Sequence, residues 1–361
     1  MKRKFIPLAL AFLFSGVAGA QSNVQIYGTI DVGFSHYGDN IAPGVGSKNA
    51  IDSGVSADNT LGFRGVEDLG NGLKASFVLE ADFTADDGQQ ADNRLFSQSF
   101  LGLSGGFGTL LVGRIDGGHY NFLKSYDPFA DGTVGKYSNI YANLEGGGTY
   151  GLFNPKTADN TLLYLSPSWN GFNVIAAYMT TAAGQEGVAN EGDVRVMAVY
   201  PHYVNGPLDV AIYAHRIDGR HMEKVGAPDI TVDNRAVGGS YDFKVVKLSA
   251  FYDASKWKDF GGGNDDIKLN SWLVGASVPF GKHAVQASYI RSKHKYQGDS
   301  KTARQWALGY TYRLSKRTNF YAAYADISND DGRAASVGDA TRTGDADQYQ
   351  NGLSVGLRHT F

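Results

Sequence analysis

The chain has 361 residues, with 33 Lys and Arg against 36 Asp and Glu, and it has no cysteine. The missing cysteines exclude disulfides and thiolate metal sites, and a slightly acidic chain with dispersed basic residues argues against nucleic-acid binding. Its 47 Gly, 21 Tyr and 20 Phe are typical of closely spaced strands with aromatic belts and untypical of a disordered chain.

The N-terminus has the pattern of a secretory signal peptide. Residues 2–4 are Lys-Arg-Lys, residues 5–14 form an apolar stretch, and residues 18–20 form an Ala-Gly-Ala cleavage site. The apolar stretch is too short to span a membrane as a helix. We therefore expect residues 1–20 to be removed on export. The mature part, residues 21–361, then has 30 Lys and Arg against 36 Asp and Glu, a net charge of −6.

Apolar and polar side chains alternate along one segment after another in the mature part. In the first segment, Val24 and Ile26 share one face, whereas Gln25 and Tyr27 share the other. Because side chains alternate across a strand, each segment has one apolar and one polar or small face, as a wall between lipid and water requires. The same alternation recurs at residues 61–64, 73–83, 172–178, 194–200 and 305–314.

The connections between these segments are of two kinds. Tight connections rich in Gly, Asn or Pro are typical of hairpin turns. They lie at residues 69–72, 105–108, 166–171, 203–207, 243–246, 279–282 and 314–317. Longer polar connections lie at residues 38–57, 86–93, 116–158, 182–191, 217–232, 256–267, 293–302 and 328–349.

Seven short turns that alternate with eight long loops predict sixteen strands. The expected fold is all-β, a transmembrane antiparallel barrel of sixteen strands whose two chain ends lie at the end with the short turns. Such a barrel is wide enough for an aqueous channel. A soluble sandwich or propeller would have more even loop lengths and a sealed core.

The last eleven residues form the strand that this fold needs at its C-terminus. One of its faces is largely apolar and ends in a terminal Phe, and the other is small or polar. The first face holds Leu353, Val355, Leu357, His359 and Phe361.

Several stretches resemble the Gram-negative general porin family of the beta-proteobacterial type. They are residues 24–33, 61–80, 100–109, 112–114, 310–318 and 355–361. The resemblance implies a homotrimer of sixteen-stranded barrels in contact with outer-membrane lipid. It also implies a water-filled channel for passive diffusion of ions and small hydrophilic solutes. We expect the barrel-assembly machinery to act on the strand that ends at Phe361, and we expect no cofactor and no metal.

In this family the third external loop folds into the barrel and narrows it. Here that loop is the longest connection, residues 116–158. The match assigns Lys124, Asp127, Asp131 and Lys136 to the narrow zone, and the strand alternation turns Arg64, Lys74, Glu80 and Asp82 toward the lumen. Arg94 and Arg114 complete the expected lumen charges. Acids and bases on opposite sides of a channel create a transverse field that sorts solutes by charge.

The chain departs from the family pattern at three positions where members often have arginine. The corresponding residues are Thr60, Ser97 and Leu163. A channel without this basic cluster is expected to be only weakly anion-selective or mildly cation-selective.

Two other functions are compatible with an exported chain of this kind. An outer-membrane enzyme would need a paired nucleophile and base, and none of the eight His stands in a recognisable pairing with a motif Ser. A substrate-specific channel for sugars or small organic acids is the alternative to a general porin. It could use the aromatic residues of the third loop as a track, but these could equally pack the loop against the wall. The aromatic residues are Tyr120, Phe122, Tyr126, Phe129, Tyr137, Tyr141, Tyr150 and Phe153.

Overall fold

The computed structural model describes residues 23–40, 46–91, 94–141, 156–180, 193–220, 229–258, 266–296, 298–330, 335–338 and 349–361. The expected signal peptide, residues 1–20, and the loop residues Tyr150 and Phe153 lie outside the described residues. None of the described helices has the length and apolar character needed to cross a membrane.

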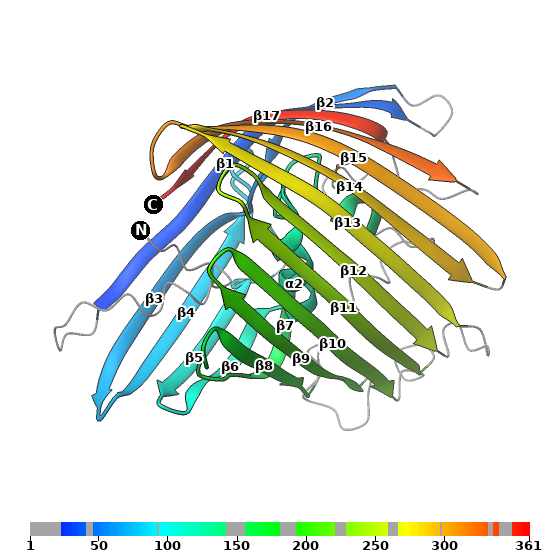
Figure 1. The fold of residues 1–361 in the computed structure, drawn as a ribbon. Helices are drawn as coiled ribbons and strands as arrows, with labels where there is room; N and C mark the ends of the chain where they lie inside the picture. Colours follow the sequence, from blue (N-terminus) through cyan, green and yellow to red (C-terminus); the bar gives the residue numbers. More distant parts are fainter. Residues whose placement is uncertain are drawn as a thin grey trace.

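The described strands form one antiparallel sheet that closes on itself, with two short helices between β6 and β7 (Figure 1). Closure joins the first strand to the last, from Thr29 opposite Thr360 to Asn40 opposite Tyr349. The strands are β1 Asn23–Asn40, β2 Lys48–Ser53, β3 Asn59–Gly70, β4 Leu73–Phe83, β5 Gln98–Gly105, β6 Gly108–Asp116, β7 Thr157–Leu165, β8 Phe172–Met179, β9 Asp193–Asn205, β10 Leu208–Arg220, β11 Ile230–Asp242, β12 Lys247–Lys258, β13 Ile267–Phe280, β14 His283–Tyr296, β15 Asp299–Arg313, β16 Thr318–Asp330 and β17 Tyr349–Thr360. The helices are α2 Gly118–Tyr126 and α3 Ser138–Tyr141.

The seventeen strand segments occupy sixteen positions in the barrel, because β2 and β3 share one. β2 pairs with Val32–Tyr37 in the second half of β1, and β3 pairs with Asn23–Thr29 in its first half. Residues 54–58 leave the wall between them. The sixteen-stranded barrel is therefore confirmed. The prediction of a first loop over residues 38–57 was wrong in part, because β2 lies inside it.

The short turns agree with the sequence. At the first of them, Asn71 has φ 53° between Gly70 and Gly72 with φ 84° and 77°, which is the left-handed backbone that a tight hairpin needs. One expected long loop, residues 293–302, is wrong, because β14 runs to Tyr296 and β15 begins at Asp299. Its alternation was hidden by the many polar residues on the inner face of these strands.

The outer face of the barrel is apolar, as the alternation predicts. Ile26 and Leu101 have exposed fractions of 63% and 69%, whereas the inward Asp31 and Ser35 on β1 are fully buried. An apolar face of this kind would be unfavourable in contact with water but is stable in contact with lipid. This face is therefore the membrane surface. At the seam, Phe361 exchanges two backbone hydrogen bonds with Gly28, and its ring lies over that glycine.

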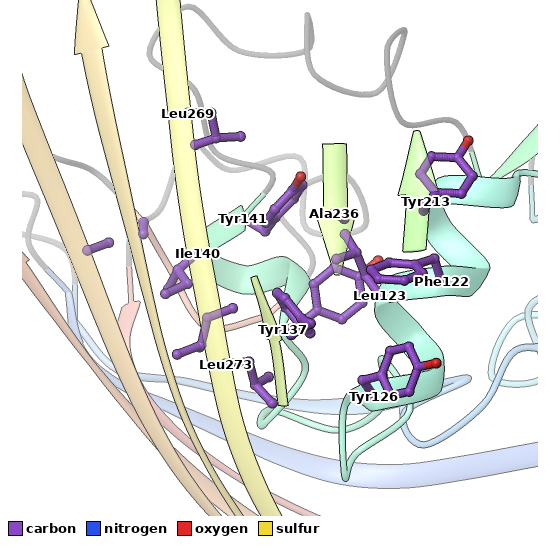
Figure 2. Packing of buried hydrophobic residues seen from close by; sticks show 14 of the residues in the cluster. Phe122, Leu123, Tyr126, Tyr137, Ile140, Tyr141, Tyr213, Ala236, Leu269 and Leu273 are labelled. Carbon is purple, nitrogen blue, oxygen red and sulfur yellow. The ribbon is translucent and has the colours of Figure 1, made fainter. Parts of the chain in front are cut away.

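The third loop folds into the barrel, where α2 lies inside the ring of strands (Figure 1). Its aromatic side chains pack against the inner wall, and Figure 2 shows Phe122, Tyr126, Tyr137 and Tyr141 grouped beside strand residues such as Leu273. The four rings are at most 1% exposed. Each buried large apolar side chain contributes about 1.5–3 kcal/mol, so these aromatic residues hold the loop in place.

Glycines in the wall make room for this loop. A Cβ on Gly238 of β11 would lie 2.4 Å from the Tyr126 ring, and one on Gly275 of β13 would lie 2.2 Å from Pro128. On β15, a Cβ at Gly309 would lie 2.6 Å from Phe129. The three glycines thus form a shallow surface that accepts the loop.

Gly275→Val tests this fit. The new side chain would overlap the rigid Pro128 ring, and overpacking of this kind costs about 1–3 kcal/mol. We expect a lower thermal unfolding temperature and a larger or noisier single-channel conductance. Gly106→Val is the matched control, because a Cβ there meets no atom within 4 Å. Equal stability of the two variants would contradict the proposed role of the wall glycine.

Candidate functional site

A cavity of about 950 Å³ lies between the third loop and the wall. Its lining comes mainly from β1, β3–β9 and α2. The aromatic residues of the loop pack on β9–β17, so the loop fills that side of the barrel and leaves the lumen open on the other. The channel is therefore displaced toward β3–β8.

Four acids and two lysines line the part of the cavity near the loop. The acids are Asp58, Glu80, Asp82 and Asp116, and the lysines are Lys124 and Lys156. Lys156 Nζ lies 2.5 Å from Asp58 and 3.4 Å from Asp82. Ser97 Oγ donates to Asp82 at 2.7 Å, and Gln98 Nε2 donates to Glu80 at 2.9 Å. These contacts hold Asp58, Glu80 and Asp82 in fixed positions.

Two basic side chains lie over aromatic rings of the lining. The Arg64 guanidinium carbon lies 4.8 Å from the centre of the Tyr27 ring, and its Nε donates to Gln25 at 3.1 Å. Lys124 Nζ lies 5.1 Å from the centre of the Tyr120 ring. Contacts of a cation with a ring face restrict the side chain while leaving its charge in place.

Asp58 reaches the lumen because of the detour between β2 and β3. The buried Asp31 accepts hydrogen bonds from Ser56 N at 3.2 Å and Ala57 N at 3.1 Å, and Tyr321 donates to it at 2.5 Å. These bonds fix the segment that presents Asp58. Strand alternation could not place this residue, because residues 54–58 are not strand.

The structure brings together five of the ten expected lumen charges at the cavity, namely Arg64, Glu80, Asp82, Lys124 and Asp127. Arg94 and Arg114 instead form ion pairs with Asp159. Arg94 Nη1 lies 2.7 Å from Asp159 Oδ2. Lys74, Asp131 and Lys136 lie outside the cavity lining, and Lys74 is next to the turn before β4. A role in solute passage stays a prediction for all ten.

Thr60, Ser97 and Leu163, the three positions at which the resemblance leads us to expect arginine, all line the cavity. Leu163 belongs to an apolar cluster with Leu111 and Ile115 on the same wall. The sequence alternation placed Leu163 inward correctly, but it gave no sign that neighbouring strands add apolar residues beside it. That grouping depends on the pairing of β6, β7 and β8.

The family model of the Gram-negative porin matches residues 8–332. The chain belongs to the Gram-negative porin family. It is 33% identical to outer membrane porin protein 32 of Delftia acidovorans and 32% identical to an outer membrane porin protein of Bordetella pertussis, each over the whole of both chains. Among solved structures, it is similar to the anion-selective porin from Comamonas acidovorans, with a TM-score of 0.79 and 30% identity over 94% of this chain and 100% of that one.

These findings confirm the resemblance, the barrel fold and a porin channel in the outer membrane of a Gram-negative cell. The third-loop aromatic residues Phe122, Tyr126, Tyr137 and Tyr141 are packing residues, since their side chains are buried against the wall. A track of these rings for sugars is thus not favoured.

Asp127 organises the third loop. Its carboxylate accepts hydrogen bonds from the backbone N–H of Phe129 at 3.1 Å, Asp131 at 3.0 Å and Tyr137 at 3.2 Å. Burial raises the pKa of Asp127 to about 7, although these donors act in the opposite direction. Asp127 is only 5% exposed and its acceptor oxygens are directed at the loop backbone, so it is less accessible to a passing ion than the other acids of the lining.

Asp127→Asn should loosen the loop more than it changes ion preference. The amide keeps one acceptor oxygen for the three N–H donors, and each buried donor left without a partner costs about 1–3 kcal/mol. We expect a lower unfolding temperature, more current noise and a smaller reversal-potential shift than in Asp82→Asn, the charge-matched comparison. Unchanged stability together with an equal shift would show that Asp127 acts mainly as a lumen charge.

Proposed function

We propose that this porin is a general diffusion channel with weak charge preference, inclined toward cations. The observation that carries the proposal is the lining of the lumen. Thr60, Ser97 and Leu163 contribute no charge where the family often has arginine, and Asp58, Glu80, Asp82 and Asp116 face Arg64, Lys124 and Lys156. The described lining also holds Asp127, Asp209, Lys247 and Arg317, so six acids against five bases give a small negative excess.

Ion pairing supports a weak preference over a strong one. Lys156 shares its charge between Asp58 and Asp82, so this group acts at a distance as a single negative charge. A narrow passage with low-dielectric walls still focuses the field of such a group on a passing ion. The similar porin from Comamonas acidovorans is described as anion-selective. We propose that the present channel differs from it in sign or strength because its basic positions are neutral.

We propose a channel and not an enzyme. Support comes from the role of His119, whose Nε2 lies 2.7 Å from Asp253 Oδ2, in a buried group that joins the third loop to β12. His202 similarly lies 3.0 Å from Asp209 on the neighbouring strand. These histidines have structural partners. Export with cleavage after Ala20, and insertion by the barrel-assembly machinery through the strand ending at Phe361, belong to the same proposal.

Reversal potentials test the charge preference. One unit charge at ~4 Å and an effective dielectric constant near 20 is worth ~4 kcal/mol, and salt reduces this over a Debye length of ~10 Å at 0.1 M. In a low-salt KCl gradient across a planar bilayer, we expect weak cation preference in the unmodified channel. Leu163→Arg and Asp82→Asn should shift the potential toward anions, and Arg64→Gln toward cations. Strong anion selectivity of the unmodified channel would refute the proposal.

A homotrimer is the assembly expected from the family. The purified protein in mild detergent should have the mass of three chains by light scattering. It should run as a single chain on a denaturing gel after boiling, because heat separates the barrels. A single-chain mass in mild detergent would contradict this prediction.

A further inference from the structure

The lumen wall has an apolar area that a water-filled channel does not require. We call it the lumen strip and define it as Val78, Phe100, Leu111, Leu163, Ile175 and Ala177, on β4–β8. All six line the cavity. Inward positions of a water-filled barrel are normally polar, so six neighbouring apolar residues there call for an explanation.

Strand register and side-chain packing together make the strip continuous, because Phe100 lies opposite Gly113 but packs against the cluster of Leu111 and Leu163. Val78 lies opposite Phe100, Leu111 lies opposite Leu163, and Leu163 lies opposite Ala177 on the next strand. Directly opposed side chains on neighbouring strands contact each other. The core of the strip also forms a buried cluster separate from the one under the third loop. Ile175 also packs against the cluster under the loop, whereas Leu111 and Leu163 belong to the separate cluster, so the loop does not account for the core of the strip.

The strip is partly open on the channel side. Leu111 and Leu163 are buried among their neighbours, whereas Phe100, Ile175 and Ala177 remain partly exposed at the cavity. An apolar surface in contact with lumen water is stabilised when an apolar group covers it. A passing solute with an apolar body would supply that group.

The charges at the edge of the strip indicate the second part of such a solute. Glu80 is two residues beyond Val78 on the same face of β4, and Asp116 follows Ile115 at the end of β6. Arg64 lies opposite Val78, but its guanidinium is stacked on Tyr27 and bonded to Gln25. Lys124 and Lys156 also line this part of the cavity, together with Asp58 and Asp82, so four acids there outnumber three bases by one. This excess favours an ammonium group over a carboxylate.

We infer that the lumen strip and the acids at its edge form a binding subsite for small organic cations with an apolar body, such as aromatic or branched-alkyl ammonium ions. The apolar body lies on Phe100, Leu163 and Ile175, and the ammonium group lies toward Glu80 and Asp116. This inference rests on the proposed diffusion channel and adds a solute class to it.

Block of the potassium current measures the subsite directly. The purified protein in a planar bilayer is titrated with methylammonium, butylammonium, benzylammonium and benzoate. Burial of each methylene strengthens binding by up to about fourfold. We expect benzylammonium to bind at least about tenfold more tightly than methylammonium, and more tightly than benzoate. Equal affinity for benzylammonium and methylammonium would overturn the role of the lumen strip in binding. Benzoate binding as tight as that of benzylammonium would overturn the role of the acids.

Leu163→Ala and Ile175→Ala locate the subsite. Each should reduce the ratio of benzylammonium to methylammonium affinity by about threefold or more. Leu162→Ala is the matched control, since Leu162 is the neighbour of Leu163 on the outer face and is 47% exposed. A ratio unchanged in both strip variants would overturn the inference. Potassium conductance in each variant shows that the channel is folded and open. If the unmodified protein conducted no potassium, that result would refute the proposed function and not the subsite alone.

Discussion

The structure depends on burial of the third loop against the inner wall. Phe122 packs against Tyr200 and Tyr213 with ring centres 5.8 Å apart in both pairs, and Tyr126 donates to Asp209 at 2.9 Å. A sixteen-stranded barrel without such a loop would enclose a wide, uniform lumen. Ordering an inserted segment costs conformational entropy. Burial of its aromatic side chains supplies the favourable free energy that offsets this cost.

Everything else about the channel follows from which side the loop occupies. Because it packs on β9–β17, the passage runs along β3–β8, and side chains of those strands, of β1 and β9 and of α2 form most of its lining. The charges of Glu80, Asp82 and Lys156 face this passage, as does the apolar Leu163. A loop packed on the opposite wall would expose a different set of residues from the same sequence.

The relation to the similar porins separates fold from selectivity. Identity of 30% with the Comamonas acidovorans porin accompanies a TM-score of 0.79, so about two-thirds of the residues differ while the barrel is conserved between the two. A barrel requires only outward apolar residues, inward small or polar residues and suitable turns. The residues at positions 60, 97 and 163 line the cavity, and the proposed charge preference rests on them.

The sequence by itself determined the strand count and the membrane face, since alternation and turns such as Asn71-Gly72 are local. The insertion of the third loop was implied by the resemblance to the porin family. The alternation also turned Arg64, Glu80 and Asp82 correctly toward the lumen. Only the tertiary structure decided that Asp58 reaches the passage, that Asp127 is held by three loop amides, and that Leu163 adjoins Leu111 and Ala177. The physical reason is that these arrangements depend on strand register and loop packing, which join residues far apart in the chain.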